Sequence, residues 1–191
     1  MNRRNFLKSA AAAGTAALIP ALSVEASAEP VPDPVTILRE LKRTPQRTIA
    51  PEARVTIEKL KRTPRLRQMA PSIDIQSINF AFGSAAIPAN QRWKVEQIAI
   101  AIRQILKHDP HEVFLIEGHT DAVGSPSANL ALSQARAASV GQVLVHYFRV
   151  PRRAIDTIGY GESHLLVPTP NAEWRNRRVT LRRVTDFVAR H

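Results

Sequence analysis

The feature that most constrains the fold is the order in which apolar residues change their spacing between residues 72 and 186. Alternation of apolar and polar residues predicts a half-buried strand, whereas spacings of three and four predict a helix with one apolar face. The chain switches between these two patterns and then ends with two strands in succession. This β-α-β-α-β-β order predicts an α/β two-layer sandwich, with a mixed sheet and the helices on one face.

The first predicted strand alternates clearly, because Ile78, Phe80 and Phe82 share one face. A Ser125–Pro126 pair gives the capping signal for the second helix. The predicted strands are 75–82, 112–118, 153–161 and 176–184, and the predicted helices lie within 87–110 and 125–148.

The composition restricts the chemistry that this chain can carry. The 191 residues suffice for one ordinary domain with extensions. Cysteine is absent, which excludes disulfides, thiolate metal sites, cysteine nucleophiles and a lipid-modified N-terminal cysteine. The formal charge of +11 points to an anionic partner or surface without naming it.

Residues 1–28 have the layout of an export signal. A basic start precedes a short Ala-rich apolar stretch, and an A-x-A sequence ends at Ala28. The Arg3–Arg4 pair followed by Asn-Phe-Leu-Lys resembles a twin-arginine signal. We therefore expect cleavage after Ala28 and a periplasmic, envelope-associated chain; an uncleaved N-terminal anchor is the alternative.

Residues 29–71 form a predicted basic, Pro-containing linker with short helices. The pentapeptide Leu-Lys-Arg-Thr-Pro occurs twice, beginning at Leu41 and Leu60. Val35, Leu38 and Leu41 lie on one predicted helical stripe. Two interpretations remain open at this point: a solvated spacer, or a basic arm over residues 39–67 that contacts an anionic membrane or envelope polymer.

An acid and a base suggest a binding site in the domain predicted over 72–186. Asp121 follows the second predicted strand, and Arg136 lies on the apolar stripe of the second helix, with Asn129 on the same line. Loops after strands that lead into helices are common ligand sites in α/β folds. One carboxylate and one guanidinium suit a zwitterion such as an amino-acid end, whose carboxylate the guanidinium can hold by two hydrogen bonds. Direct pairing of Asp121 with Arg136 is the competing interpretation.

Four motifs carry a resemblance to a known family: GHTDAVGS, NLALSQARAASV, IGYGES and NRRV. In their order and spacing they resemble the OmpA-like C-terminal domain family, over about residues 75–183. The resemblance implies non-covalent binding of peptidoglycan through the diaminopimelate of its stem peptide. It implies that Asp121 and Arg136 are the principal ligand-binding residues, with Asn129, Arg177, Gly118 and Thr120 also at the site.

Other kinds of chemistry have weaker support in the sequence. His108 and His111 flank a proline without a metal-site pattern, and we expect no metal and no cofactor. GYGES does not place its serine as a nucleophile elbow does. A glycosidase needs two carboxylates across a groove, and Glu117 with Asp121 is the only candidate pair. We therefore expect no enzyme activity and no nucleic acid partner; a peptidoglycan-associated hydrolase or a polyanion-binding envelope protein is the alternative function.

Overall fold

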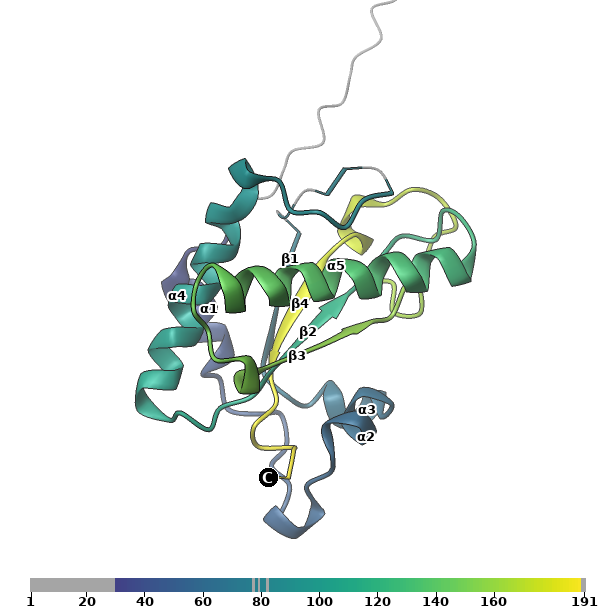
Figure 1. Ribbon diagram of the computed structural model, residues 1–191. Helices are drawn as coiled ribbons and strands as arrows, with labels where there is room; N and C mark the ends of the chain where they lie inside the picture. The colour runs from purple at the N-terminus through teal and green to yellow at the C-terminus, as the bar shows by residue number, and fades with distance from the viewer. Residues whose placement is uncertain (1–29, 77, 79, 82, 190–191) are drawn as a thin grey trace, which may run out of the picture.

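The computed structural model describes residues 30–189 except 77, 79 and 82 (Figure 1). The export signal predicted over 1–28 therefore lies outside the described residues, as does Phe82. None of the helices in the described ranges is both long and apolar enough to cross a bilayer. The strands are β1 (Ser72–Ile75), β2 (Phe114–Gly118), β3 (Ile155–Gly159) and β4 (Val179–Arg183). The α-helices are α1 (Pro34–Leu41), α2 (Ile57–Lys61), α3 (Pro64–Arg67), α4 (Arg92–His108) and α5 (Pro126–His146).

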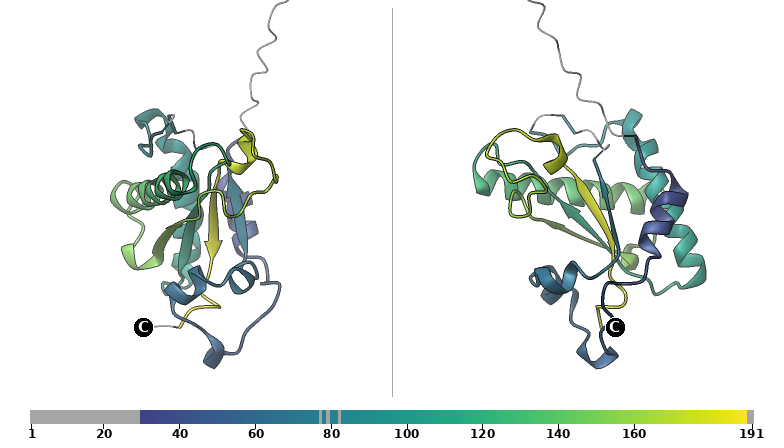
Figure 2. Two further views of the ribbon diagram at one scale, coloured as in Figure 1. Left: turned by 90° about the vertical axis from the view of Figure 1, so that its right-hand side faces the viewer. Right: turned by 180° about the vertical axis from the view of Figure 1, so that it is seen from behind.

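The strands form one mixed sheet in the order β1-β4-β2-β3. β2 and β3 run parallel, as expected for strands joined by a helix, and the other two pairings are antiparallel. Helices α4 and α5 lie on the same face of this sheet (Figure 2). The predicted α/β sandwich with a β-α-β-α-β-β order is thus confirmed.

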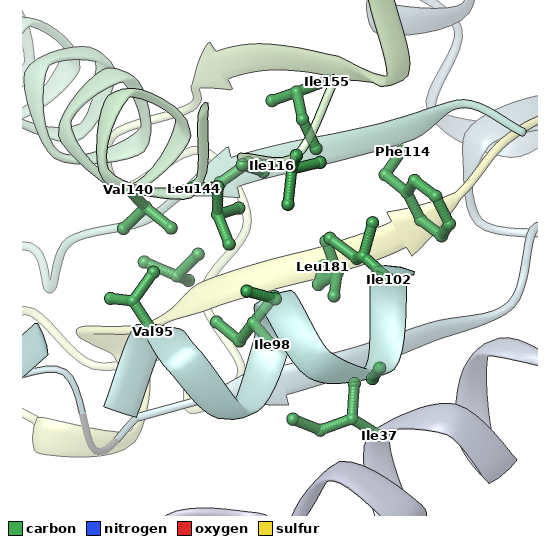
Figure 3. Packing of buried hydrophobic residues seen from close by; sticks show 14 of the residues in the cluster. Ile37, Val95, Ile98, Ile102, Phe114, Ile116, Val140, Leu144, Ile155 and Leu181 are labelled. Atoms are coloured by element: carbon green, nitrogen blue, oxygen red, sulfur yellow. The ribbon is translucent and has the colours of Figure 1, made fainter. Parts of the chain in front are cut away.

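The main core lies between the sheet and these two helices (Figure 3). Phe114, Ile116 and Leu181 point from the sheet toward the helices, and all three are at most 1% exposed. Ile98 of α4 and Leu144 of α5 meet them from the other layer. Within each helix the buried apolar residues recur at the helical spacing that the sequence predicted. The helical layer of the fold therefore follows directly from the sequence pattern.

The first strand differs from its predicted range of 75–82. β1 ends at Ile75, where it pairs with Val179, the first residue of β4. A strand needs a hydrogen-bonded neighbour, and β4 offers no residue of its own beyond Val179. Ile78 is nevertheless buried and Phe80 packs against the core, so the apolar side chains were identified correctly and the backbone pairing was not.

The short helices of the predicted linker are present, but these residues are not a solvated spacer. Asp33 caps α1 by accepting hydrogen bonds from the backbone N–H groups of Val35 and Thr36. Ile37 and Leu41 are fully buried in the main core, where α1 packs beside α4. Val35, predicted on the same stripe as Leu41, is instead 70% exposed.

Residues 45–71, which we call the arm, close the opposite face of the sheet. Side chains alternate along a strand, so Leu115 and Ile158 point away from α4 and α5. They belong to a second apolar cluster together with Leu60 of the arm. The arm is also held by its backbone, since the N–H of Val55 donates to the carbonyl oxygen of Phe187 at 3.0 Å.

Leu41→Ala tests whether α1 is part of the folded domain. We expect the free energy of unfolding to fall by about 2–5 kcal/mol, because a fully buried leucine leaves a cavity. Val35→Ala on the same helix is the matched control and should change it by less than about 0.5 kcal/mol. Urea unfolding measures both, and equal small effects would show that α1 does not contribute to the fold.

Candidate functional site

The sheet brings distant parts of the chain together at one edge. Gly118, the last residue of β2, pairs with Val179, the first residue of β4. Asp121 follows β2 by three positions and Arg177 precedes β4 by two, so both lie beyond this edge. Helix α5 begins just after the same loop, where Ser125 accepts a hydrogen bond from the N–H of Ala128 at 3.3 Å.

Asp121 is paired with Arg177, and not with Arg136. The Nη1 of Arg177 lies 2.7 Å from Oδ2 of Asp121. The other carboxylate oxygen accepts a longer hydrogen bond, 3.4 Å, from the N–H of Val123. The Asp121 side chain is 11% exposed and that of Arg177 is 45% exposed. The carboxylate is therefore mostly covered, and its partner is the more accessible of the two.

Arg136 is held beside this pair by two other residues. Its Nε donates to the carbonyl oxygen of Ser84 at 3.1 Å, and its guanidinium lies 4.9 Å from the centre of the Phe80 ring. Among the described residues, its two terminal nitrogens have no hydrogen-bond partner. Burial lowers the pKa of Arg136, the charge of Arg177 lowers it further and the charge of Asp121 opposes both. The charges of Arg177 and Asp121 thus both act on the guanidinium of Arg136.

This arrangement carries two guanidinium groups and one carboxylate. The pair formed by Asp121 and Arg177 is neutral overall, so the charge of Arg136 is left without a counter-ion among the described residues. A half-buried, preoriented guanidinium favours a bound carboxylate, which it can contact through its planar fork. The site can therefore hold an anionic group at Arg136, while Asp121 is already paired with Arg177.

Asn129 organises the loop that carries Asp121. Its side-chain amide donates toward the carbonyl oxygens of Asp121 and Val123, at 3.3 and 3.2 Å, and to Oε2 of Glu162 at 2.6 Å. The residue is 6% exposed. The amide nitrogen is thus fully used within the protein, and direct contact of Asn129 with a ligand stays a prediction.

Gly118 and Thr120 lie on the same segment as Asp121. A Cβ on Gly118 would lie 2.1 Å from the carbonyl oxygen of Ser133, so only glycine lets α5 approach β2 this closely. The N–H of Thr120 donates to the carbonyl oxygen of Gly161 at 3.0 Å. The buried Thr120 hydroxyl has no partner among the described residues. Gly118 is therefore needed for packing, while Thr120 retains an unused polar group.

A second group of charges, on the other face of β2, was not expected from the sequence. Glu117 is 1% exposed, and its carboxylate contacts Arg182 at 2.9 Å and Arg67 at 3.1 Å. Arg67 comes from the arm and lies over the ring of Tyr160, 4.0 Å from its centre. Because Glu117 is sealed from solvent and paired twice, it does not form a carboxylate pair with Asp121 across a groove.

The surroundings of Glu117 keep it ionised. Burial alone would raise the pKa of Glu117, but its contact with His119 and the charges of Arg182 and Arg67 lower it to about 2. Burial also lowers the pKa of His119, whose ring nitrogens have no hydrogen-bond partner in the described part of the chain. This group lies directly behind the segment that leads to Asp121, so it supports the loop from the opposite face.

Sequence reasoning missed several contacts of the site. Phe80 was assigned to a strand face, and nothing in the pattern linked it or Ser84 to Arg136. Glu162 lies within the IGYGES motif, which was the available signal for its contact with Asn129. Arg67 gave no signal, because a basic segment has no feature that marks which arginine will be buried.

Two parts of the chain match known sequence families. Residues 79–178 match the model of the OmpA family, which is more than half of the chain. Residues 1–20 match the twin-arginine translocation pathway signal sequence. The predicted resemblance and the predicted signal type are both confirmed by these matches.

Individual relatives share only part of their length with this chain. Outer membrane porin F of Pseudomonas aeruginosa is 34% identical over 104 residues, which are 53% of this chain and 29% of the porin. Porin F of Pseudomonas fluorescens is 35% identical, over 53% of this chain and 30% of the porin. A crystal structure of the peptidoglycan-associated lipoprotein from Burkholderia pseudomallei has 28% identity and a TM-score of 0.47, covering 56% of this chain and 87% of the lipoprotein. The chain thus spans less than a third of the porins that it matches.

Glu117→Gln tests the buried charge group. The pKa of Glu117 in the folded state, about 2, is below its ordinary value of 4.5. Its ionisation therefore stabilises the fold above pH 4.5, and this contribution is lost as the pH falls toward 2. We expect urea unfolding between pH 5 and 2 to show a steeper loss of stability in the wild type than in the variant. At pH 7 the variant should be less stable by about 3–5 kcal/mol, since two buried arginines lose their counter-charge.

Glu52→Gln is the matched control, because Glu52 is exposed and makes no ion pair in the described part of the chain. This control should follow the wild-type pH profile. Parallel profiles for the wild type and Glu117→Gln would contradict the assignment of the buried charge.

Proposed function

The chain belongs to the OmpA family, and on that premise we propose that it binds peptidoglycan without a covalent bond and anchors or organises the cell envelope. Its export signal directs it out of the cytoplasm, to the envelope compartment where peptidoglycan lies. We propose in addition that it is associated with the outer membrane. Domains of this family bind and anchor and do not catalyse, which agrees with the prediction that the chain is not an enzyme.

The ligand proposed for the site is the diaminopimelate of the stem peptide. Its side chain ends in an amino-acid group, with a carboxylate and an ammonium on one carbon. The carboxylate would bind the free fork of Arg136, and the ammonium would bind Asp121. Each charge-assisted hydrogen bond contributes about 1.5–3 kcal/mol. The observation that carries the proposal is the unpaired terminal group of Arg136, preoriented by Ser84 and Phe80 beside Asp121.

Arg177 has a supporting part in this proposal. In the unliganded chain it neutralises Asp121, which keeps a mostly buried carboxylate paired. An incoming ammonium would share that carboxylate. The exposed Arg177 would then be free to contact a carboxylate of the ligand. Asn129 would keep the loop in place, and Thr120 would offer its unused hydroxyl.

A peptidoglycan hydrolase is a weaker alternative. Glycoside cleavage needs a carboxylic acid and a carboxylate that both face the scissile bond. Glu117 is sealed between Arg67 and Arg182 with its pKa lowered to about 2, so it holds no proton at neutral pH. The predicted contact of residues 39–67 with an anionic partner remains a separate proposal, which the fold of the arm supports.

Removing either principal charge should weaken capture by peptidoglycan. We expect Asp121→Ala and Arg136→Ala each to weaken cosedimentation with purified sacculi about tenfold to a hundredfold, through loss of one or two charge-assisted bonds. Glu52→Ala and Arg153→Ala, both exposed and remote from the site, are the controls and should bind like the wild type. Circular dichroism checks that all four variants are folded. Undiminished binding by both site variants would refute the proposed site.

The ligand chemistry can be tested by competition. A soluble muropeptide with diaminopimelate should displace the chain from sacculi, because it offers both the carboxylate and the ammonium. A muropeptide with lysine at that position keeps the ammonium and lacks the carboxylate, so it should compete at least about tenfold less well. Equal competition by the two peptides would show that Arg136 does not read the diaminopimelate carboxylate.

A further inference from the structure

The positive charge of this chain is concentrated at one end of the sheet. The paired residues Phe114 and Ile155 begin β2 and β3, so the segments leading into them lie at a common end. β1 also begins there, since Ser72 pairs with Arg182 near the end of β4. This end faces away from Asp121, which lies beyond the opposite edge. In Figure 1, α2, α3 and the last described residues all lie below the sheet.

Seven exposed cations occupy this region, and we call them together the basic end. They come from the end of α1, the arm, the end of α4 and the turn before β3. Their side chains make no hydrogen bond and no ion pair with any described residue. They are Lys42, Arg47, Lys59, Arg62, Arg65, Lys107 and Arg153.

Two acidic residues nearby are already paired with other cations, and the exposed Glu52 of the arm makes no ion pair with a described residue. Glu58 is already paired with Lys61, and Glu112 with Arg183. At the opposite edge the exposed Arg175 and Arg177 are paired with Glu173 and Asp121, and among the described residues there Arg136 alone is left without a counter-ion. The two ends of the domain therefore differ in unpaired charge, and not only in the number of basic residues.

The fold fixes the direction in which the arm presents its cations. Lys61 is turned inward, with its ammonium 2.8 Å from the carboxylate of Asp156. Tyr160 donates a hydrogen bond of 2.8 Å to the carbonyl oxygen of Lys61, and Arg67 is buried against Glu117. With these two basic side chains used as anchors, four other cations of the arm, Arg47, Lys59, Arg62 and Arg65, are exposed to solvent, and Arg54 is half-buried.

We propose that the basic end binds the headgroups of an anionic lipid bilayer while the opposite edge holds peptidoglycan. The cations come from separate segments, so they form a surface and not a groove for one extended polymer. Many separate phosphates on a bilayer can meet such a surface without fixed geometry, and each nearby cation strengthens binding about fivefold. The export signal places the chain across a membrane, where such a surface is available.

Both ends can act at the same time. The five-residue strand β2 alone separates them by roughly 15 Å, and charges in solvent are screened within about 8–10 Å. Binding at one end therefore does not oppose binding at the other. This inference rests on the proposed function only for the ligand at Asp121, since the basic end would bind lipid without it.

Vesicle binding tests the inference with two charge-matched variants. The protein purified from the periplasm is sedimented with two kinds of vesicle. One is phosphatidylcholine alone, and the other contains about 30% of the anionic lipid phosphatidylglycerol. The first variant, Arg62→Gln/Arg65→Gln/Arg153→Gln, removes three charges from the basic end. The second, Arg136→Gln/Arg175→Gln/Arg177→Gln, removes three from the opposite edge. Sedimentation with sacculi is measured in parallel for each protein.

The expected result is a crossed one. The first variant should bind anionic vesicles about a hundredfold more weakly, from three fivefold losses, and should keep sacculus binding. The second should keep vesicle binding and lose sacculus binding, and raised salt should release the wild type from vesicles. Absence of wild-type vesicle binding, equal binding to neutral vesicles, or equal losses in both variants would overturn the inference. Binding to soluble polyphosphate without binding to vesicles would also overturn it. Loss of wild-type sacculus binding alone would count against the proposed function and leave the inference standing.

Discussion

The structure depends on keeping one carboxylate charged inside the protein. Glu117 points away from the main core, into a region with almost no solvent, and an unpaired charge there would be very unfavourable. Arg182 of β4 and Arg67 of the arm both contact it, so its burial requires the sheet and the arm to come together. One charge thereby ties two distant parts of the chain, β4 and the arm, to the strand that leads to the ligand loop. Such buried groups are more informative about arrangement than about net stability, because pairing only offsets the cost of desolvation.

At the candidate site, in contrast, the charges are only partly paired. Asp121 is mostly covered and is neutralised by Arg177, while Arg136 is oriented by a carbonyl oxygen and an aromatic ring that bring no negative charge. The protein thus satisfies the acid and leaves one guanidinium without a counter-ion. That asymmetry favours a ligand with a carboxylate, and it explains how two opposite charges can lie near each other without cancelling. Glu173, four positions before Arg177, does not add a free acid here, because it forms a two-pronged pair with Arg175.

Charge and packing together fix the position of the arm on the domain. The arm uses Leu60 for the second apolar cluster and Lys61 and Arg67 for ion pairs, so its position is fixed by side chains that solvent does not reach. The cations that remain, such as Arg62 and Arg65, are exposed to solvent. The basic segment is therefore a structural part of the domain and not a solvated spacer, and its contact with an anionic partner stays a prediction.

The sequence by itself determined the element order, the apolar faces of α4 and α5, and the approximate places of Asp121 and Arg136, because local periodicity and short motifs carry this information. It also determined the export signal and the family, through motifs that need no partner. Only the tertiary structure decided that Asp121 pairs with Arg177, 56 positions away, that β1 ends where β4 begins, and that Arg67 is the buried arginine of the arm. Each of these depends on which groups meet after folding, and a linear pattern does not encode the distance between residues that are far apart in the chain.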